Sequence, residues 1–329
     1  MKVLVTSIPF AAKSGQALEI LDDAGVDLVV NPLGRKPDER ELVEMVRGFD
    51  AVLAGTERWS DEVMESAPGL RLIARMGTGL DGVDLMAARR RGIAVTWTPG
   101  APVEAVAEMT VALALSALRG VHESNLAMHA GRWHRVSGRR LGDVTVGVVG
   151  LGPIGRRVLD LIGAFRPPRV LLHDLRPDES VLIGSRSPTP EWTGLEELLT
   201  ESDLVTVHVP LSSSTRGLIN EVGLRRMPSD AVLVNTSRGG VVDEAALHRV
   251  LVEGHLGAVA LDVFESEPYS GPLTGFERCI LTSHMSSYSV DCRGRMEAEA
   301  ADEVVRLSTG RGPIHPVPEA EYLMQAGDQ

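Results

Sequence analysis

Short apolar runs alternate along the chain with longer stretches in which apolar and polar residues recur at helical spacing. Before residue 100 the apolar runs lie at residues 3–6, 26–30, 51–54, 70–74 and 94–96. After residue 140 they resume at residues 144–149, 170–173, 204–207, 232–234, 258–261 and 280–282. Strands that alternate with helices predict a parallel sheet covered by helices on both faces. Two such series predict two α/β domains.

The stretches between the strands predict helices, and the most apolar of these spans residues 102–118. Apolar residues cover most of its circumference, which is more than one core face needs. A subunit interface and burial between two domains would each account for the surplus. The helix predicted at residues 291–307 follows the second sheet, and we expect it to return to the first domain. Residues after 311 are expected to be loosely ordered.

A glycine pattern follows the apolar strand at residues 144–149. Residues 150–155 read Gly-Leu-Gly-Pro-Ile-Gly, with a predicted helix at 153–165 and a strand at 170–173 after them. Asp174 ends that strand, 174 − 155 = 19 residues past the last glycine, which fits a dinucleotide fingerprint. Asp174 is predicted to accept hydrogen bonds from the adenosine ribose hydroxyls. Because a 2′-phosphate there would meet a like charge, the pattern favours NAD over NADP.

Length, net charge and cysteine content restrict the kinds of protein to which this chain can belong. A length of 329 residues suits about two domains. The net charge of −12 argues against a nucleic-acid partner. The longest uncharged apolar run, residues 109–118, is too short to span a membrane. Cys279 and Cys292 form no CxxC pattern, and the chain starts with a strand rather than a signal peptide, so we expect a cytoplasmic protein.

Four charged or titratable residues follow predicted strands of the second series. Arg238 lies after the strand at 232–234, Asp262 and Glu267 after the strand at 258–261, and His284 after the strand at 280–282. Singly, Arg238 would suit a surface ion pair, Glu267 a helix cap and His284 a core histidine. The carboxyl ends of parallel strands border the ligand crevice, however, so together they predict a site beside the dinucleotide.

In its motifs the chain resembles the NAD-dependent D-2-hydroxyacid dehydrogenase family, and in particular its phosphoglycerate dehydrogenase-like branch. The resemblance rests on residues 75–84, 105–108, the fingerprint, 202–211 with Thr215, and the three polar segments. It implies a Rossmann NAD-binding domain, residues 100–287, inserted into a flavodoxin-like substrate domain, residues 1–99 and 288–329. It also implies a homodimer, held by a helix and arm at about residues 102–140.

The resemblance implies hydride transfer between the nicotinamide C4 and a 2-oxo acid or D-2-hydroxy acid. Arg238 would clamp the substrate carboxylate and carbonyl oxygen, because a planar guanidinium suits bidentate recognition. His284 would deliver or remove the hydroxyl proton, and Glu267 would orient it and favour the imidazolium. No metal is implied.

The resemblance also assigns contacts residue by residue. The cofactor would contact Thr78, Val106, Gly150, Gly152, Pro153, Ile154, Gly155, Asp174, His208, Val209, Pro210, Thr215, Thr236, Ser237, Asp262 and Ser287. The substrate would contact Arg75, Gly77, Thr78, Gly79, Arg238 and Arg293. In these sets Asp262 would hold the nicotinamide carboxamide, and the amides of residues 77–79 would complete the carboxylate site. Candidates for binding a second anionic group, a phosphate or a phosphonate, are Arg58, Arg75, Arg135 and Arg293, with Arg293 first because it lies near the start of the last predicted helix.

Departures from the family pattern cluster at the nicotinamide end. Pro102 replaces a common asparagine or serine, Ser283 a frequent proline, and residues 285–287 a small, glycine-containing run. These changes argue against phosphoglycerate itself as the substrate. The chain ends soon after the last predicted helix, so we expect no feedback by serine.

Two other functions fit the same motifs. One is oxidation of a small inorganic or one-carbon acid, as in the phosphite and formate dehydrogenases of the same superfamily, although Glu267 argues against the formate type. The other is NAD(H) sensing, as in the C-terminal-binding corepressors. Those proteins also retain the arginine, glutamate and histidine that correspond to Arg238, Glu267 and His284. Turnover of a simple acid would separate the enzyme from the sensor.

Overall fold

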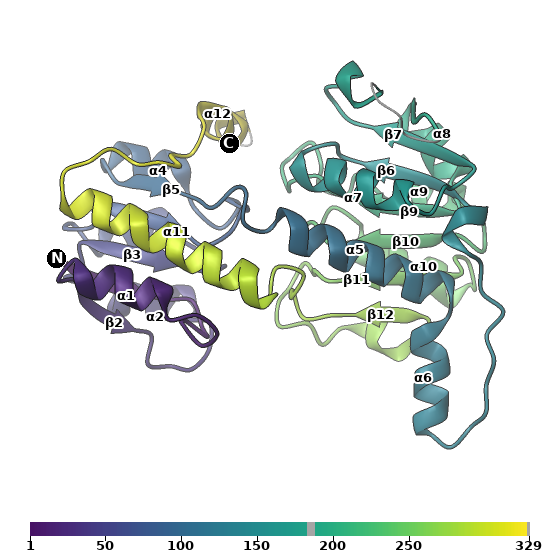
Figure 1. The fold of residues 1–329 in the computed structure, drawn as a ribbon, viewed down its shortest axis with the longest axis horizontal. Coiled ribbons are helices and arrows are strands. Elements are labelled where there is room, and N and C mark those ends of the chain that lie inside the picture. The colour runs from purple at the N-terminus through teal and green to yellow at the C-terminus, as the bar shows by residue number, and fades with distance from the viewer. Residues whose placement is uncertain (183–187, 328–329) are drawn as a thin grey trace. The chain divides into compact units, whose positions relative to one another are not determined.

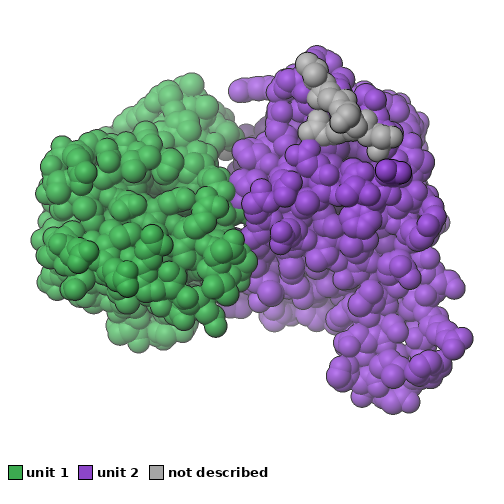
Figure 2. Space-filling view, viewed as in Figure 1, with its two compact units in different colours: residues 1–102, 288–329 green, residues 103–287 purple. Residues whose placement is uncertain are grey.

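The computed structural model describes residues 1–182 and 188–327, and it divides the chain into two compact units (Figure 2). Unit 1 contains residues 1–102 and 288–329, and unit 2 contains residues 103–287. Each unit is built on one sheet in which every strand pair is parallel. The two series of apolar runs therefore form two separate parallel sheets, one in each α/β unit, as the alternation predicts.

Unit 1 has a five-stranded sheet in the order β2-β1-β3-β4-β5 (Figure 1). Its strands are β1 (Lys2–Val5), β2 (Asp27–Val30), β3 (Ala51–Ala54), β4 (Leu72–Arg75) and β5 (Ala94–Thr96). Its helices are α1 (Gln16–Asp23), α2 (Glu39–Met45), α3 (Asp61–Glu65), α4 (Leu85–Arg90), α11 (Val290–Ser308) and α12 (Glu319–Gly327). Helix α11 packs along α1 and over β4, so the chain returns to the first sheet after completing the second.

Unit 2 has a seven-stranded sheet in the order β12-β11-β10-β9-β6-β7-β8. Its strands are β6 (Thr145–Val149), β7 (Arg169–His173), β8 (Glu191–Trp192), β9 (Leu204–Val207), β10 (Val232–Asn235), β11 (Ala258–Leu261) and β12 (Cys279–Leu281). Its α-helices are α5 (Val103–Leu118), α6 (Val121–His129), α7 (Pro153–Gly163), α8 (Leu195–Glu201), α9 (Glu221–Arg226) and α10 (Glu244–Val252). Short 3₁₀ turns are η1 (Leu141–Asp143), η2 (Glu179–Leu182) and η3 (Pro272–Gly275). The strand order reverses between β6 and β9, which makes their carboxyl ends the switch point of the sheet.

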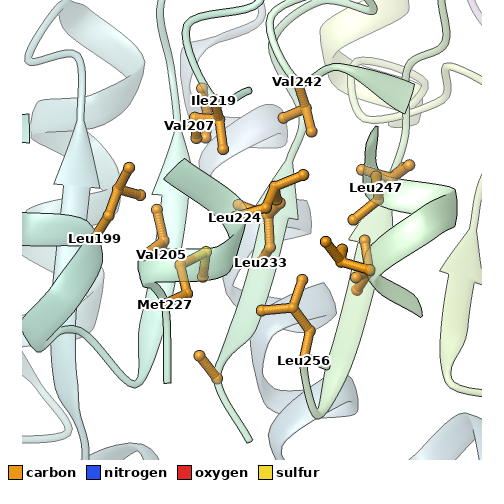
Figure 3. Packing of buried hydrophobic residues seen from close by; sticks show 14 of the residues in the cluster. Leu199, Val205, Val207, Ile219, Leu224, Met227, Leu233, Val242, Leu247 and Leu256 are labelled. Atoms are coloured by element: carbon orange, nitrogen blue, oxygen red, sulfur yellow. The ribbon is translucent and has the colours of Figure 1, made fainter. Parts of the chain in front are cut away.

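Two apolar cores cover the two faces of the unit 2 sheet. Successive strand side chains point to opposite faces, so Leu233 joins the core beneath α8, α9 and α10 while Val232 and Val234 join the core beneath α5 and α7. Figure 3 shows the first of these cores, in which Leu224 of α9 and Leu247 of α10 belong to the same cluster as Val205 of β9 and Leu233 of β10. This double burial explains why the strands read as continuous apolar runs rather than as alternating ones.

The end of the chain corrects one expectation. Residues after 311 are not loosely ordered throughout, because α12 forms there and packs against α4. The Gln325 side chain donates to the carbonyls of Leu80 and Val83 and accepts from the amide of Leu85. The Arg89 guanidinium stacks 3.7 Å from the centre of the Tyr322 ring. Polar and cation–π contacts hold this helix, and none of its residues is fully buried.

Helix α5 packs against α7, β10 and β11 inside unit 2. Helix α6 extends away from the sheet, and the chain returns to β6 through residues 130–140 without regular structure (Figure 1). Within residues 1–182 and 188–327, no single helix is long and apolar enough to cross a membrane, and only α5 and α6 taken together, bent by 68°, pass that test.

Candidate active site

The glycine turn lies at the switch point of the unit 2 sheet. Gly150 has a φ of +92° and donates its amide to the His173 carbonyl over 2.8 Å. A β-carbon on Gly155 would lie 1.9 Å from the Gly150 carbonyl oxygen, so the start of α7 needs glycine to pack on the turn. Gly152 differs, because a β-carbon there would meet nothing within 4 Å and its φ is −65°. Gly152 is exposed at the start of α7, and no described residue fills the space beside it.

Asp174 lies at the end of β7, facing this turn. One carboxylate oxygen accepts from the Leu151 amide over 2.7 Å, and the other accepts from the Arg176 amide over 2.9 Å. Both bonds fix the carboxylate beside the first residues of the fingerprint. Each oxygen keeps a second acceptor position for hydroxyl donors.

The carboxyl end of β9 borders the other side of the turn. Thr215 accepts from the Ser212 amide and donates to the Pro210 carbonyl, which closes the loop after Val209. Neither ring nitrogen of His208 has a hydrogen-bond partner among the described residues. Burial lowers the pKa of His208 to about 3, so the ring is neutral at physiological pH.

Arg238 follows β10 in a loop organised by a buried asparagine. The Asn235 side-chain oxygen accepts from the amide and the hydroxyl of Ser237, and its nitrogen donates to the Arg238 carbonyl over 2.9 Å. The Arg238 guanidinium also donates to the Ser237 carbonyl over 2.7 Å. The preceding residue, Thr236, is buried, and its hydroxyl lies 2.8 Å from that of Thr110 on α5. Thr110 in turn donates to the carbonyl of Val106.

His284 and Glu267 form a pair at the ends of β11 and β12. The Nδ1 atom of His284 lies 2.8 and 3.1 Å from the two carboxylate oxygens of Glu267, and the side chains are 29% and 25% exposed. Because Nδ1 is engaged by the carboxylate, Nε2 is the nitrogen left to face a substrate. A partly exposed imidazole held in this way can donate and accept a proton.

Gly239 joins the loop of Arg238 to the loop of Glu267. A β-carbon on Gly239 would lie 2.0 Å from the Phe264 carbonyl carbon and 2.4 Å from the Glu265 amide nitrogen. The two loops therefore touch at a point where only glycine fits. This contact places the Arg238 segment directly against the segment that carries Glu267.

The predicted substrate residues of unit 1 lie at the carboxyl end of β4. Gly77, with a φ of +144°, donates its amide to the Thr98 hydroxyl over 2.8 Å. Thr78 and Gly79 are partly exposed beside it. The Arg75 side chain is buried and donates to the Met76 carbonyl, close under Gly77.

Arg293, on α11, is also engaged within unit 1. It is 7% exposed, pairs with Glu297 over 2.8 Å and donates to the Pro9 carbonyl over 3.0 Å. Its guanidinium carbon lies 4.9 Å from the centre of the Tyr288 ring. Arg293 therefore links α11 to the loop after β1.

Three polar residues at or beyond strand ends were not predicted as functional from the sequence: Asn235 and Thr282 in unit 2, and Glu57 in unit 1. Glu57 is 2% exposed, and its Oε1 accepts from the Gly55 amide, the Trp59 indole and the Thr6 hydroxyl. The one feature of the sequence that could have identified these residues is their position at or beyond the end of a strand. In residues 1–182 and 188–327, no group of three or more His, Cys, Asp or Glu side chains could hold a metal.

Comparison with known proteins defines the class. The family model of the D-isomer specific 2-hydroxyacid dehydrogenase NAD-binding domain matches residues 111–286. A glyoxylate reductase from Thermofilum pendens is 39% identical over 288 residues, 84% of each chain. The chain belongs to the D-isomer specific 2-hydroxyacid dehydrogenases, which makes it an NAD-binding oxidoreductase with the predicted Rossmann fold.

Solved structures agree with this family. A Thermus thermophilus protein has a TM-score of 0.86 and 37% identity over 97% of this chain and 100% of its own. The D-lactate dehydrogenase of Aquifex aeolicus, solved with NAD and lactic acid, has a TM-score of 0.81 and 26% identity over 94% of this chain and 96% of its own.

Proposed function

We propose that this enzyme reduces a small 2-oxo acid, of the glyoxylate or hydroxypyruvate type, to the corresponding 2-hydroxy acid with NADH, and that it forms the D isomer where the product is chiral. The His284–Glu267 pair beside the Arg238 loop carries the proposal, since it supplies a proton donor next to a cation at the carboxyl edge of a dinucleotide-binding sheet. The name of the Thermofilum pendens relative supports a small acid. A phosphate- or phosphonate-bearing acid is the second candidate, but Arg293 already holds Glu297 and the Pro9 carbonyl.

The side chains divide the work of the reaction. The Arg238 guanidinium binds the substrate carboxylate and draws negative charge onto the carbonyl oxygen. The Nε2–H of His284 gives its proton to that oxygen as the hydroxyl forms. Glu267 holds the ring through Nδ1 and stabilises the imidazolium before the transfer. Bound NADH supplies the hydride, and the protein supplies orientation and charge.

The residues at the switch point fit the dinucleotide. The open space at Gly152 and the amides at the start of α7 suit a pyrophosphate. The spare acceptor positions on Asp174 suit the two ribose hydroxyls, and its charge disfavours a 2′-phosphate, so we propose a preference for NAD over NADP. The same proposal places Val209, Pro210 and Thr215 along the adenosine, and Val106, Thr236, Ser237 and Ser287 near the nicotinamide. The substrate roles of residues 77–79 stay predictions.

Two glycine substitutions separate cofactor binding from folding. Gly152→Ala is expected to keep the unfolding temperature and weaken NADH binding about 10-fold, because its methyl group would occupy only the space kept for the pyrophosphate. Gly155→Ala is expected to destabilise the protein by about 2–3 kcal/mol, because its methyl group overlaps the Gly150 carbonyl. Thermal unfolding and NADH titration of both variants measure the two effects. Equal NADH affinity in wild type and Gly152→Ala would contradict the assignment.

A substrate panel tests the proposed reaction. NADH oxidation is measured with glyoxylate, hydroxypyruvate, pyruvate, phosphohydroxypyruvate and phosphonopyruvate, and each active acid is repeated with NADPH. We expect the highest kcat/KM with glyoxylate or hydroxypyruvate and with NADH. Turnover of NAD with phosphite instead would support the phosphite-type reaction. Tight NADH binding without turnover of any acid would support the sensor.

We also propose that the chain forms a homodimer through α5, α6 and the following arm. Trp133 is 77% exposed, Val121 54% and Met128 49%, which leaves apolar surface on a segment that extends away from its own sheet. Light scattering is expected to give twice the mass of one chain. A single-chain mass at micromolar concentration would contradict the proposal.

A further inference from the structure

The Asp262 carboxylate lies beneath the loop that carries His284. Asp262 has no exposed surface, and its two oxygens receive three hydrogen bonds from that loop. Oδ1 accepts from the Thr282 hydroxyl over 2.6 Å and from the Met285 amide over 2.9 Å. Oδ2 accepts from the Ser286 amide over 2.8 Å. These three donors flank His284 on both sides in sequence.

The arrangement requires two acceptor oxygens. The amides of Met285 and Ser286 can only donate, and they reach opposite oxygens of the same side chain. An asparagine at residue 262 would satisfy one amide and turn its own NH₂ group toward the other. A buried donor left without an acceptor is unfavourable, so the loop selects a carboxylate here.

The backbone of His284 needs this support. Its φ is +51°, a left-handed conformation that a residue with a β-carbon rarely adopts. Its amide donates to the Asp262 carbonyl over 2.8 Å and to the Thr282 carbonyl over 3.1 Å. Such a conformation persists only where the surroundings hold it in place. Asp262 and Thr282 therefore hold His284 through backbone as well as side-chain atoms.

We propose that Asp262 and Thr282 are positioning residues for His284, which fix the imidazole against Glu267 and toward the substrate. This inference rests on the proposed role of His284 as the proton donor. The family resemblance gives Asp262 to the nicotinamide carboxamide. Here three of its four acceptor positions are taken by the His284 loop, which leaves one on Oδ2. The resemblance assigns no role to Thr282, so an effect of Thr282 on turnover is expected only if Asp262 and Thr282 position His284.

The test compares Thr282→Val with Thr282→Ser. Valine keeps the shape of threonine and removes the hydroxyl, whereas serine keeps the hydroxyl. We expect Thr282→Val to lower kcat about 10-fold with an unchanged NADH dissociation constant, because a small displacement of a proton donor slows transfer. Thr282→Ser is expected to keep kcat within about twofold of wild type, since the bond to Oδ1 survives. Thr282→Ala replaces Thr282→Val if the latter does not fold.

Other outcomes would overturn the inference. Full turnover in Thr282→Val would show that the hydroxyl does not position His284. If Thr282→Val binds NADH more weakly and this weakening accounts for the whole loss of turnover, the result would support a role of Asp262 in cofactor binding instead.

A readout without turnover separates this inference from the proposed function. If wild type reduces no acid of the panel, the proposed function fails, and the imidazole NMR signals of His284 still report its position. We expect Thr282→Val to shift the Nδ1 signal and Thr282→Ser to leave it near the wild-type value. A wild-type Nδ1 signal in Thr282→Val would refute the positioning role by itself.

Discussion

His284→Ala is expected to lower kcat about 10²- to 10⁴-fold, the range that a positioned general acid contributes. The imidazole is the group whose Nδ1 lies 2.8 Å from Glu267 and whose Nε2 is left for the substrate. Without it, water must protonate the developing alkoxide. The measurement is the steady-state rate of NADH oxidation with the best acid of the panel, together with NADH titration by fluorescence.

NADH binding is the internal control for this variant. We expect the dissociation constant of NADH to stay within about threefold of wild type, because the fingerprint and Asp174 lie on other strands. Glu267→Gln gives a graded comparison, since glutamine keeps one acceptor for Nδ1 and loses the negative charge. It is expected to retain more activity than His284→Ala. Unchanged turnover in His284→Ala would reject His284 as the acid.

The strands were predictable because both faces of each sheet are covered. β3, β9 and β11 are buried along most of their length, so each appears in sequence as an apolar run of the observed length. β8 was missed because it has only two residues and holds the sheet edge through backbone pairs to β7. Helix α12 was missed because its contacts come from Gln325, Arg89 and Tyr322 rather than from a periodic apolar face.

The site was predictable to the extent that strand order determines it. Polar residues just beyond β10, β11 and β12 stand at one edge of a parallel sheet, so the position of Arg238, Glu267 and His284 at that edge could be predicted from the sequence, while their roles stay predictions. Asn235 and Thr282 were not, because their function lies in hydrogen bonds to backbone atoms and to a buried carboxylate. Such bonds depend on loop conformation, including the positive φ of His284, which no periodicity encodes.

The second large effect is expected from Arg238→Ala, which should lower kcat/KM about 10³-fold. Two charge-assisted hydrogen bonds to the substrate disappear, each worth roughly 1.5–3 kcal/mol. KM should rise because carboxylate binding is lost, and kcat should fall because negative charge on the carbonyl oxygen is no longer stabilised in the transition state. Saturation kinetics with the best acid of the panel measure both constants.

Two further variants show which property of Arg238 explains the loss of kcat/KM. They are Arg238→Lys and the control Arg226→Ala. Lysine keeps the charge but presents a single ammonium, so we expect it to recover only part of kcat/KM. Arg226 pairs with Glu196 on the surface of unit 2, and its loss is expected to leave both constants unchanged. Full recovery by lysine would mean that charge alone, not the forked geometry, binds the acid. An unaltered KM in Arg238→Ala would remove Arg238 from carboxylate recognition, and a donor outside the β10 loop would then have to bind that group.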